Sequence, residues 1–302
     1  MPTVTLARHA MATRFEVVLL GDSETHLRAA GQEALAEVDR LENQLSLYRS
    51  GSEIAQVNAR AAHEPVRVSP EVFALLQHAA QLSAETQGAF DITIAPLVRC
   101  WGFMGGSGQM PTPAEVEVAQ ALIGMDNVRF DVCERTVQFS RPGVMLDLGA
   151  IGKGYAVERG LEILREAGVT SALFHGGTST VGAISHPPDA EAWRVAVDLP
   201  TPDGSARRQE FHLRDEALSV SAVTGRMFAV ADRKFGHVLD PRTGQPVAHA
   251  ALAAVVAPLA TETDALSTAL LTLGAVGQKL IAGLRPGLRT LVVDAAGVAT
   301  SV

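Results

Sequence analysis

Short apolar segments of strand length, separated by turn residues, recur along this chain and limit its fold more than any other feature. Segments of this length, bounded by Gly, Pro, Asn or Asp, are typical of β-strands. They are most frequent in the second half of the chain, where neighbouring segments often have the spacing of hairpins. The strands predicted in this way span residues 15–20, 128–130, 136–139, 144–146, 171–174, 193–199, 209–213, 218–221, 227–231, 251–257 and 291–294.

Fewer helices than strands are predicted. A long helix follows Gly21-Asp22, where apolar residues recur at helical spacing. Ser69 begins a second helix, Thr112 begins a third, and a fourth covers residues 153–167. Because strands outnumber helices and many have hairpin spacing, we predict the α+β class with largely antiparallel sheets. The buried stripe of the first helix consists of Leu27, Ala30, Ala34, Val38, Leu41 and Leu45.

The composition indicates a folded protein with a large core. The chain has 302 residues, of which 47% are apolar and 19% charged. This length predicts one unit spanning residues 1–302, or two intimately packed subdomains. A net charge of −8 argues against a nucleic-acid partner, because binding to phosphates needs a basic face.

The chain shows no sign of export or membrane insertion. Its start lacks the basic residues, apolar stretch and cleavage site of a signal peptide, and it lacks a Cys that could be lipidated. Cys100 and Cys133 are the only cysteines, too few for a disulfide framework or a thiolate zinc site. No apolar stretch is long enough for a transmembrane segment, so we expect a cytoplasmic protein.

An apolar helix predicted at residues 262–274 carries Asp264 and Thr268 four positions apart, on one face. Two oxygen ligands so placed can hold one hard cation. The alternative is ordinary helix chemistry, in which Thr261 is the N-cap and Thr268 bonds back to its own backbone. The local sequence alone leaves both interpretations open.

Three further stretches contain residue types suited to catalysis or binding. The glycine-rich run from Asp147 to Gly154, with Lys153, precedes a predicted helix, where exposed amides favour phosphate. His237 stands beside the turn residues Asp240 and Pro241, and an imidazole titrates near neutral pH, as a general base requires. A plain helix start and a structural histidine are the respective alternatives.

The third stretch is rich in aromatic residues. Phe90, Trp101 and Phe103 can stack on a flat ligand, although aromatic side chains are first of all core residues. Asp91 lies among them and needs a partner if it is buried.

Taken together and in this order, these runs resemble the ApbE family of FAD:protein FMN transferases. The matching segments extend from residue 11 to about residue 274, and the family commonly has Ala where this chain has Gly152. They are MATRF at Met11, SLYRSGSEI at Ser46 with Asn58, GAFDITIAPL at Gly88 with WGF at Trp101, DLGAIGKGYAV at Asp147, HVLDPRTGQPV at His237 and TDALSTALLTLG at Thr263.

The resemblance implies a role for each of several residues. It makes Asp264, Thr268 and the backbone carbonyl of Ala150 the ligands of Mg²⁺, and His237 the catalytic residue that also contacts FAD. The other residues that it implies to contact FAD are Met11, Tyr48, Ala89, Phe90, Asp91, Asp147 and Lys153.

The same resemblance implies a T-fold-like architecture and an activity. The expected reaction transfers the FMN part of FAD to a Ser or Thr hydroxyl of an acceptor protein and releases AMP. The alternatives are a pyrophosphatase that hydrolyses FAD to FMN and AMP, and a non-catalytic FAD-binding module. The combination of His237, Asp264 and Thr268 disfavours the module, because binding FAD alone would not need all three.

Overall fold

In the computed structural model, which describes residues 1–201, 207–225, 227–230 and 233–302, a large antiparallel sheet is covered by helices. The sheet has eight strands in the order β1-β2-β6-β7-β10-β15-β16-β17, and every neighbouring pair is antiparallel. Its strands are β1 Thr3–Ala10, β2 Thr13–Leu20, β6 Ser171–Gly176, β7 Thr180–Ile184, β10 Ala217–Ala222, β15 Ala250–Ala257, β16 Arg289–Asp294 and β17 Ala299–Ser301. The predicted α+β class is therefore confirmed.

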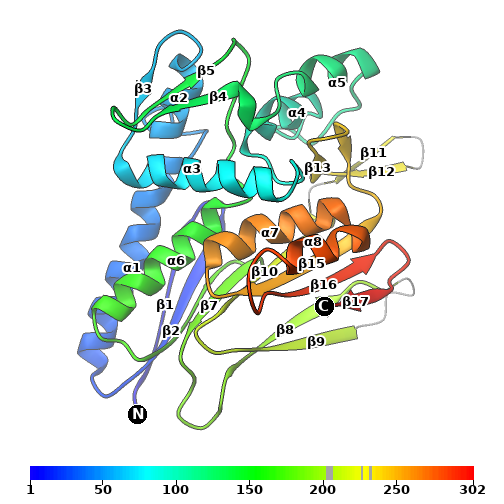
Figure 1. The fold of residues 1–302 in the computed structure, drawn as a ribbon. Coiled ribbons are helices and arrows are strands. Elements are labelled where there is room, and N and C mark those ends of the chain that lie inside the picture. The colour runs from blue at the N-terminus through cyan, green and yellow to red at the C-terminus, as the bar shows by residue number, and fades with distance from the viewer. Residues whose placement is uncertain (202–206, 226, 231–232) are drawn as a thin grey trace.

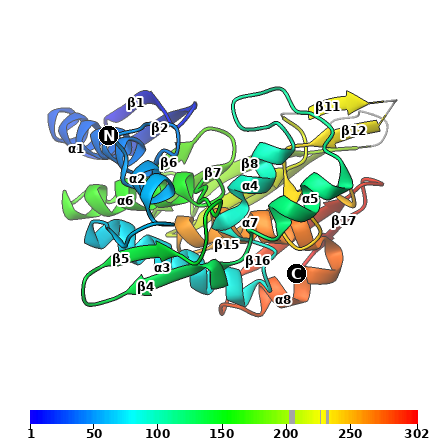
Figure 2. The ribbon, with the colours of Figure 1, turned by 90° about the horizontal axis from the view of Figure 1, so that it is seen from above.

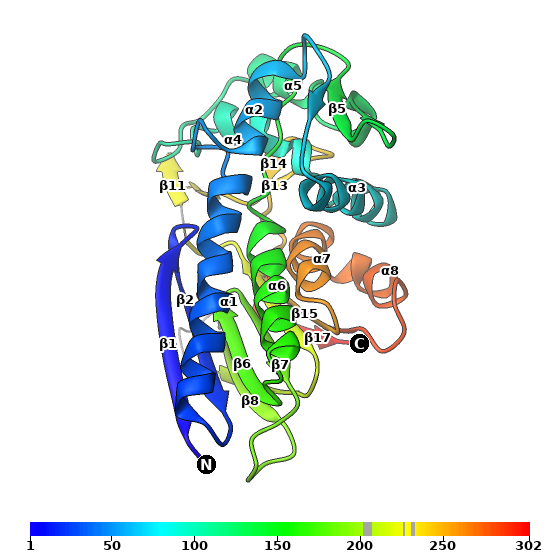
Figure 3. The same cartoon turned by 90° about the vertical axis from the view of Figure 1, so that its left-hand side faces the viewer.

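Helices pack along one face of this sheet. The long helix α1 lies against β1 and beside α6, whereas α7 lies on β10 and β15 (Figures 1 and 3). All of the side chains predicted for the buried stripe of α1 are buried. The helices of the chain are α1 Glu24–Leu45, α2 Glu53–Arg60, α3 Pro70–Glu85, α4 Ala95–Cys100, α5 Pro113–Gln120, α6 Gly152–Glu166, α7 Ala260–Leu273 and α8 Gln278–Ala282.

Alternation along β15 shows how the sheet separates two cores. Ala253, Val255 and Ala257 face the helices, and the residues between them belong to a second cluster on the other face. That second cluster is closed by the hairpin of β8 Trp193–Leu199 and β9 Arg207–Leu213. A strand that is apolar on both faces reads as a continuous apolar run, which explains the sequence of β15.

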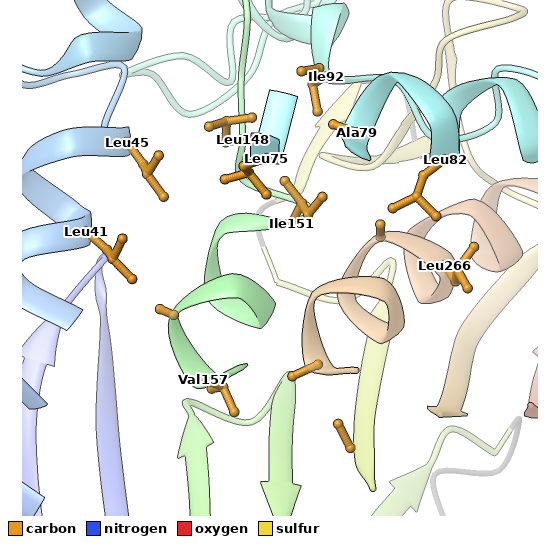
Figure 4. Close-up of a cluster of buried hydrophobic side chains, with 14 of the residues drawn as sticks. Leu41, Leu45, Leu75, Ala79, Leu82, Ile92, Leu148, Ile151, Val157 and Leu266 are labelled. Atoms are coloured by element: carbon orange, nitrogen blue, oxygen red, sulfur yellow. The ribbon is translucent and has the colours of Figure 1, made fainter. Parts of the chain in front are cut away.

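A smaller layer lies at one end of the sheet. It contains α2, α4, α5 and a three-stranded sheet, and α3 lies between this layer and the helices α6 and α7 (Figure 1). Leu75 and Leu82 of α3 lie above Ile151 and Leu266, joining the two parts of the core (Figure 4). The small sheet consists of β3 Val66–Arg67, β5 Thr136–Phe139 and β4 Val128–Asp131. Two pairs of short strands complete the fold. They are β11 Met227–Val230 with β12 Arg233–Gly236, and β13 Leu239–Asp240 with β14 Gln245–Pro246.

Several helix boundaries agree with the sequence expectations, although α2, α4 and α8 were not predicted, and the strands agree less completely. Ser69 caps α3, and Thr112 with Glu115 forms a capping box on α5. No strand forms at residues 144–146, because the Asn58 side chain pairs with both backbone groups of Leu146. Strands β1 and β7 were not anticipated, and of the strand predicted at 227–231, Ala231 lies outside the described residues.

Within the described parts of the chain, no helix has the length and apolar character needed to cross a bilayer. The expected location in the cell stays a prediction.

A partly buried ion-pair network joins α3 to α7. Arg285 Nη2 lies 2.8 Å from Glu85 of α3 and 2.9 Å from Glu262 of α7, and His78 Nε2 lies 3.2 Å from the same Glu262 oxygen. Burial alone would raise the pKa of Glu262, but hydrogen bonds from His78 and Arg285 outweigh it and lower that pKa. The network therefore favours the ionised carboxylate.

We expect Arg285→Gln to lower the free energy of unfolding by about 2 kcal/mol at pH 7, because Glu262 loses a charged donor. A carboxyl with a lowered folded pKa contributes stability above its unfolded pKa and loses it as the pH falls through the folded value. The deficit of the variant should therefore shrink below about pH 4.5. Urea unfolding at several pH values measures this deficit. Arg28→Gln, which removes an exposed ion pair with Glu24, is the control. An equal deficit at pH 7 and pH 3 would contradict this account.

Candidate functional site

Helices α6 and α7 cross so closely that each supplies a carboxylate to the first turn of the other. Asp264 Oδ2 of α7 accepts the Gly154 amide of α6 at 2.9 Å, and Glu158 of α6 accepts the Thr261 amide at 2.9 Å. Amides in the first turn of a helix have no partner within it, so both carboxylates act as caps. A Cβ on Gly154 would lie 2.2 Å from the Ala260 carbonyl oxygen, so only glycine permits this approach.

This geometry corrects one sequence expectation. Helix α7 begins at Ala260 after Leu259, and Thr261 lies inside the helix, so Thr261 is not the N-cap. The role that the capping interpretation assigned to Thr261 is filled by Glu158, which comes from another helix.

The carboxylate of Asp264 is only 3% exposed but is surrounded by polar groups. Thr180 Oγ1 lies 3.4 Å from Asp264 Oδ1, and Lys153 Nζ lies 3.9 Å from Oδ2. Lys153 also donates to the Gly149 carbonyl at 3.1 Å. The carboxylate thus has donors on both oxygens while one side of it lines a cavity.

Thr268 lies one turn further along α7 and lines the same cavity. Its hydroxyl donates to the Asp264 carbonyl at 3.3 Å and lies 3.1 Å from Ser221 Oγ. The backbone bond expected from ordinary helix chemistry is therefore present. It does not exclude a ligand role, because a hydroxyl that donates its proton to the backbone still has oxygen lone pairs for a cation.

Asp147 stands at the start of the glycine-rich run and also lines the cavity. Its Oδ1 accepts the Gly149 amide at 2.8 Å, which tightens the turn before α6. Burial raises the pKa of Asp147, and the Gly149 hydrogen bond and the charge of Lys153 oppose that rise. The Asn58 side chain holds the preceding residue, Leu146, and so fixes the path of the chain into the site.

Asp91 lines the cavity from the opposite layer and is held by hydroxyl and amide donors. Its Oδ1 accepts the Thr93 amide at 2.7 Å and the Thr93 hydroxyl at 2.6 Å, and Ser83 donates to Oδ2 at 3.2 Å. Burial raises the pKa of Asp91, although these hydrogen bonds lower it in part. The partner that a buried Asp91 requires is thus a set of neutral donors.

His237 directly follows β12 and is half-buried at the cavity wall. Its ring meets the edge of Phe103 with the ring centroids 6.4 Å apart. The following turn is rigid, because Asp240 accepts the Arg242 amide at 2.9 Å and the Arg242 guanidinium at 2.8 Å. These contacts fix the backbone on which the imidazole stands.

The aromatic residues divide between the cavity wall and its support. Phe90 and Phe103 line the cavity, but Trp101 does not. Trp101 packs against Phe228 and Phe235 of the β11–β12 hairpin, which lies beside α4 (Figure 2), and donates to the Gly244 carbonyl at 2.9 Å. Trp101 therefore packs against the hairpin and is not placed to stack on a ligand in the cavity.

One cavity of about 710 Å³ joins all of these groups. It is lined by every residue predicted for the site: Met11, Tyr48, Ala89, Phe90, Asp91, Asp147, Ala150, Lys153, His237, Asp264 and Thr268. Met11 comes from the β1–β2 turn and Tyr48, which is largely exposed, from the loop after α1. Sequence reasoning assigned no site role to several hydroxyl residues of the lining, namely Thr13, Thr178, Ser179, Ser221 and Thr224.

The donor atoms of this cavity suit a hard cation. Asp264, Thr268 and the Ala150 carbonyl offer oxygen only, which favours Mg²⁺ over softer metals. Across the described residues, His, Cys, Asp and Glu form no group of three or more that could hold a metal. A cation here would rely on one carboxylate and neutral oxygens, so a phosphate ligand would strengthen its binding.

Comparison with known proteins identifies similar chains over almost the whole length. The sequence profile of the ApbE family matches residues 11–292. A FAD:protein FMN transferase of Klebsiella pneumoniae is 28% identical over 269 residues, covering 87% of this chain and 77% of its own length. A second one from the same organism is 31% identical over 242 residues, with 77% and 73% covered.

Solved structures have the same fold. The ApbE protein of Thermotoga maritima superposes with a TM-score of 0.89 at 26% identity, covering 99% of this chain and 96% of its own. The flavinyl transferase ApbE of Pseudomonas stutzeri has a TM-score of 0.86 at 29% identity, covering 100% and 95%.

We expect Gly154→Ala to lower the free energy of unfolding by about 1–3 kcal/mol, because the new methyl group overpacks the junction of α6 and α7. Gly152→Ala is the matched control two residues away. A Cβ there meets only Leu148 Cβ at 4.0 Å, so the change should stabilise by about 0.5–1 kcal/mol. Urea unfolding measures the free energy of unfolding of both variants. Similar effects of the two substitutions would refute the close approach of α6 and α7 at Gly154.

Proposed function

The chain belongs to the ApbE family, and we propose that it transfers the FMN part of FAD to a Ser or Thr hydroxyl of an acceptor protein, with Mg²⁺ bound and AMP released. The relatives named FAD:protein FMN transferase support this activity. The observation that carries it is the single cavity, into which segments far apart in the sequence bring every residue that the resemblance implies.

We assign the cation to Asp264, Thr268 and the Ala150 carbonyl. All three line the cavity, and Asp264 is already oriented by Gly154 and Thr180. Bound Mg²⁺ would neutralise charge that develops on the pyrophosphate.

The N-terminus of α6 and Lys153 suit the pyrophosphate itself. Gly149, Ala150 and Lys153 line the cavity where α6 begins, and a helix of this length has a positive dipole end there, although its Gly152 and Gly154 amides already donate to Leu148 and Asp264. Lys153 can turn toward a phosphate oxygen, because within the described residues its ammonium makes only one hydrogen bond, to the Gly149 carbonyl at 3.1 Å, and a longer ion pair with Asp264 at 3.9 Å.

His237 is the base in the proposed transfer. The acceptor hydroxyl oxygen attacks the phosphorus next to riboflavin, and His237 takes the hydroxyl proton. The bond from that phosphorus to the bridging oxygen breaks, and the oxygen leaves with AMP. The products are a phosphoester between FMN and the acceptor, AMP and a proton on His237, which returns to solvent. Positioning and charge stabilisation carry most of such a reaction.

The test of this function is a mixture of the protein, FAD, Mg²⁺ and a candidate acceptor, followed by chromatography for AMP and mass spectrometry of the acceptor. We expect AMP release to require Mg²⁺ and the acceptor to gain the mass of FMN. AMP and free FMN without acceptor modification would indicate a pyrophosphatase instead. FAD binding with no AMP under any condition would indicate a binding module.

His237→Ala should slow AMP release by roughly 10²–10⁴-fold, the usual contribution of a positioned general base, while FAD still binds. Equilibrium dialysis measures the binding and the AMP assay the rate. His9→Ala, at an exposed position of β1, is the control and should keep the wild-type rate. Normal AMP release by the His237 variant would remove His237 from the mechanism.

Mg²⁺ and FAD should each raise the affinity of the protein for the other by the same factor, because they share one site. Calorimetric titration of FAD with and without Mg²⁺ measures this coupling, which Asp264→Asn should abolish. Glu262→Gln is the matched control, since it alters a buried carboxylate of the same helix that faces Arg285. Coupling that survives in the Asp264 variant would place the cation elsewhere.

A further inference from the structure

Several hydroxyl side chains are buried where β7 and β10 meet α7, although they lie within an otherwise apolar interface. Thr180 is 2% exposed, and Ser219 and Thr263 are fully buried. Burying a hydroxyl is costly unless it is hydrogen-bonded. Each of these hydroxyls has a partner, and the partners form a connected set.

The connections lead to Asp264. Ser219 and Thr180 are opposite each other on β10 and β7, and the Ser219 hydroxyl donates to Thr180 Oγ1 at 3.1 Å. Thr180 Oγ1 in turn lies 3.4 Å from Asp264 Oδ1. Thr263 lies 2.8 Å from Ser219 on the far side.

The direction of the last contact follows from the chemistry of its two groups. An ionised carboxylate only accepts hydrogen bonds, so the Thr180 hydroxyl is the donor in its contact with Asp264. Asp264 therefore receives Thr180 on Oδ1 and the Gly154 amide on Oδ2. Separate donors on the two oxygens, the Gly154 amide at 2.9 Å and the Thr180 hydroxyl at 3.4 Å, restrict rotation of the carboxylate.

Strand β10 contacts the second proposed ligand in the same way. Ser221 lies two residues beyond Ser219, on the same face of the strand. Its Oγ is 3.1 Å from Thr268 Oγ1 and 2.9 Å from Ser267 Oγ. Neighbouring hydroxyls of one strand thus support the two side chains on α7 that the proposed function gives to Mg²⁺.

We propose that Thr180, Ser219 and Ser221 are positioning residues of the cation site. Thr180 and Ser219 orient the Asp264 carboxylate, and Ser221 orients the Thr268 hydroxyl. This inference rests on the proposed function. Groups that orient metal ligands set the affinity of a site, and their loss typically weakens metal binding by about 10–100-fold.

The test is a titration of the FAD-free protein with Mn²⁺, followed by the electron paramagnetic resonance signal of the free ion. Thr180→Val should weaken Mn²⁺ binding by about tenfold, at the lower end of that range because the lost donor is neutral. Thr180→Ser, which restores the hydroxyl, should return the affinity to near the wild-type value. Thr290→Val is the matched control, a buried threonine of β16 whose hydroxyl bonds to the Val302 carbonyl.

Urea unfolding separates positioning from simple loss of stability. Thr180→Val and Thr290→Val both remove a buried hydroxyl, so both should unfold more easily, but only the first should lose affinity for Mn²⁺. If Thr180→Val does not fold, Ser219→Ala serves in its place. Ser219 does not line the cavity, so a weaker affinity in that variant must be transmitted through its hydroxyl partners Thr180 and Thr263.

Asp264→Asn tests the cation site itself separately from the positioning role of Thr180 and Ser219. If it binds Mn²⁺ as tightly as wild type, the assignment of the cation to Asp264 is wrong. If Asp264→Asn loses Mn²⁺ while Thr180→Val and Ser219→Ala keep the wild-type affinity, the cation site stands and the positioning role is overturned.

Discussion

The contact between the first turns of α6 and α7 is the constraint on which the site depends. Gly154 has no side chain, so α7 can approach until Asp264 reaches an amide of α6 and Glu158 reaches an amide of α7. Each carboxylate satisfies a donor that would otherwise be buried without a partner. The same contact places Asp264 beside Lys153 and turns the start of α6 toward the cavity.

The position of the cavity follows from the two-layer plan. Helices cover one face of the large sheet, and the smaller layer with α3 covers one end of those helices (Figure 1). Loops and helix starts meet at this boundary, and their polar backbone groups cannot be buried in an apolar core. A cavity lined by such groups and by Asp91, Asp147 and Asp264 is the result.

Burial raises the pKa of two acidic residues that line the cavity, Asp91 and Asp147. Asp91 caps the turn at Ile92–Ile94 and is deeply buried, so its ionised form is disfavoured and its pKa is raised. Burial raises the pKa of Asp147 as well, and the positive charge of Lys153 lowers it in part. Hydrogen bonds at both carboxylates, and the charge of Lys153 at Asp147, offset this effect of burial only in part.

The sequence by itself determined the class of the fold and the limits of several helices. Ser69 and Thr112 act on their immediate neighbours, so their effect is visible locally. The site residues were identified through a family resemblance, and their arrangement in one cavity agrees with it, whereas their individual roles stay predictions. Only the tertiary structure decided which carboxylate caps α7, why residues 144–146 form no strand, and that Thr180 contacts Asp264 while Ser219 contacts Thr180. Each of these depends on a contact between residues far apart in the chain, as between Glu158 and Thr261 or Asn58 and Leu146, and a local pattern contains no information about such a partner.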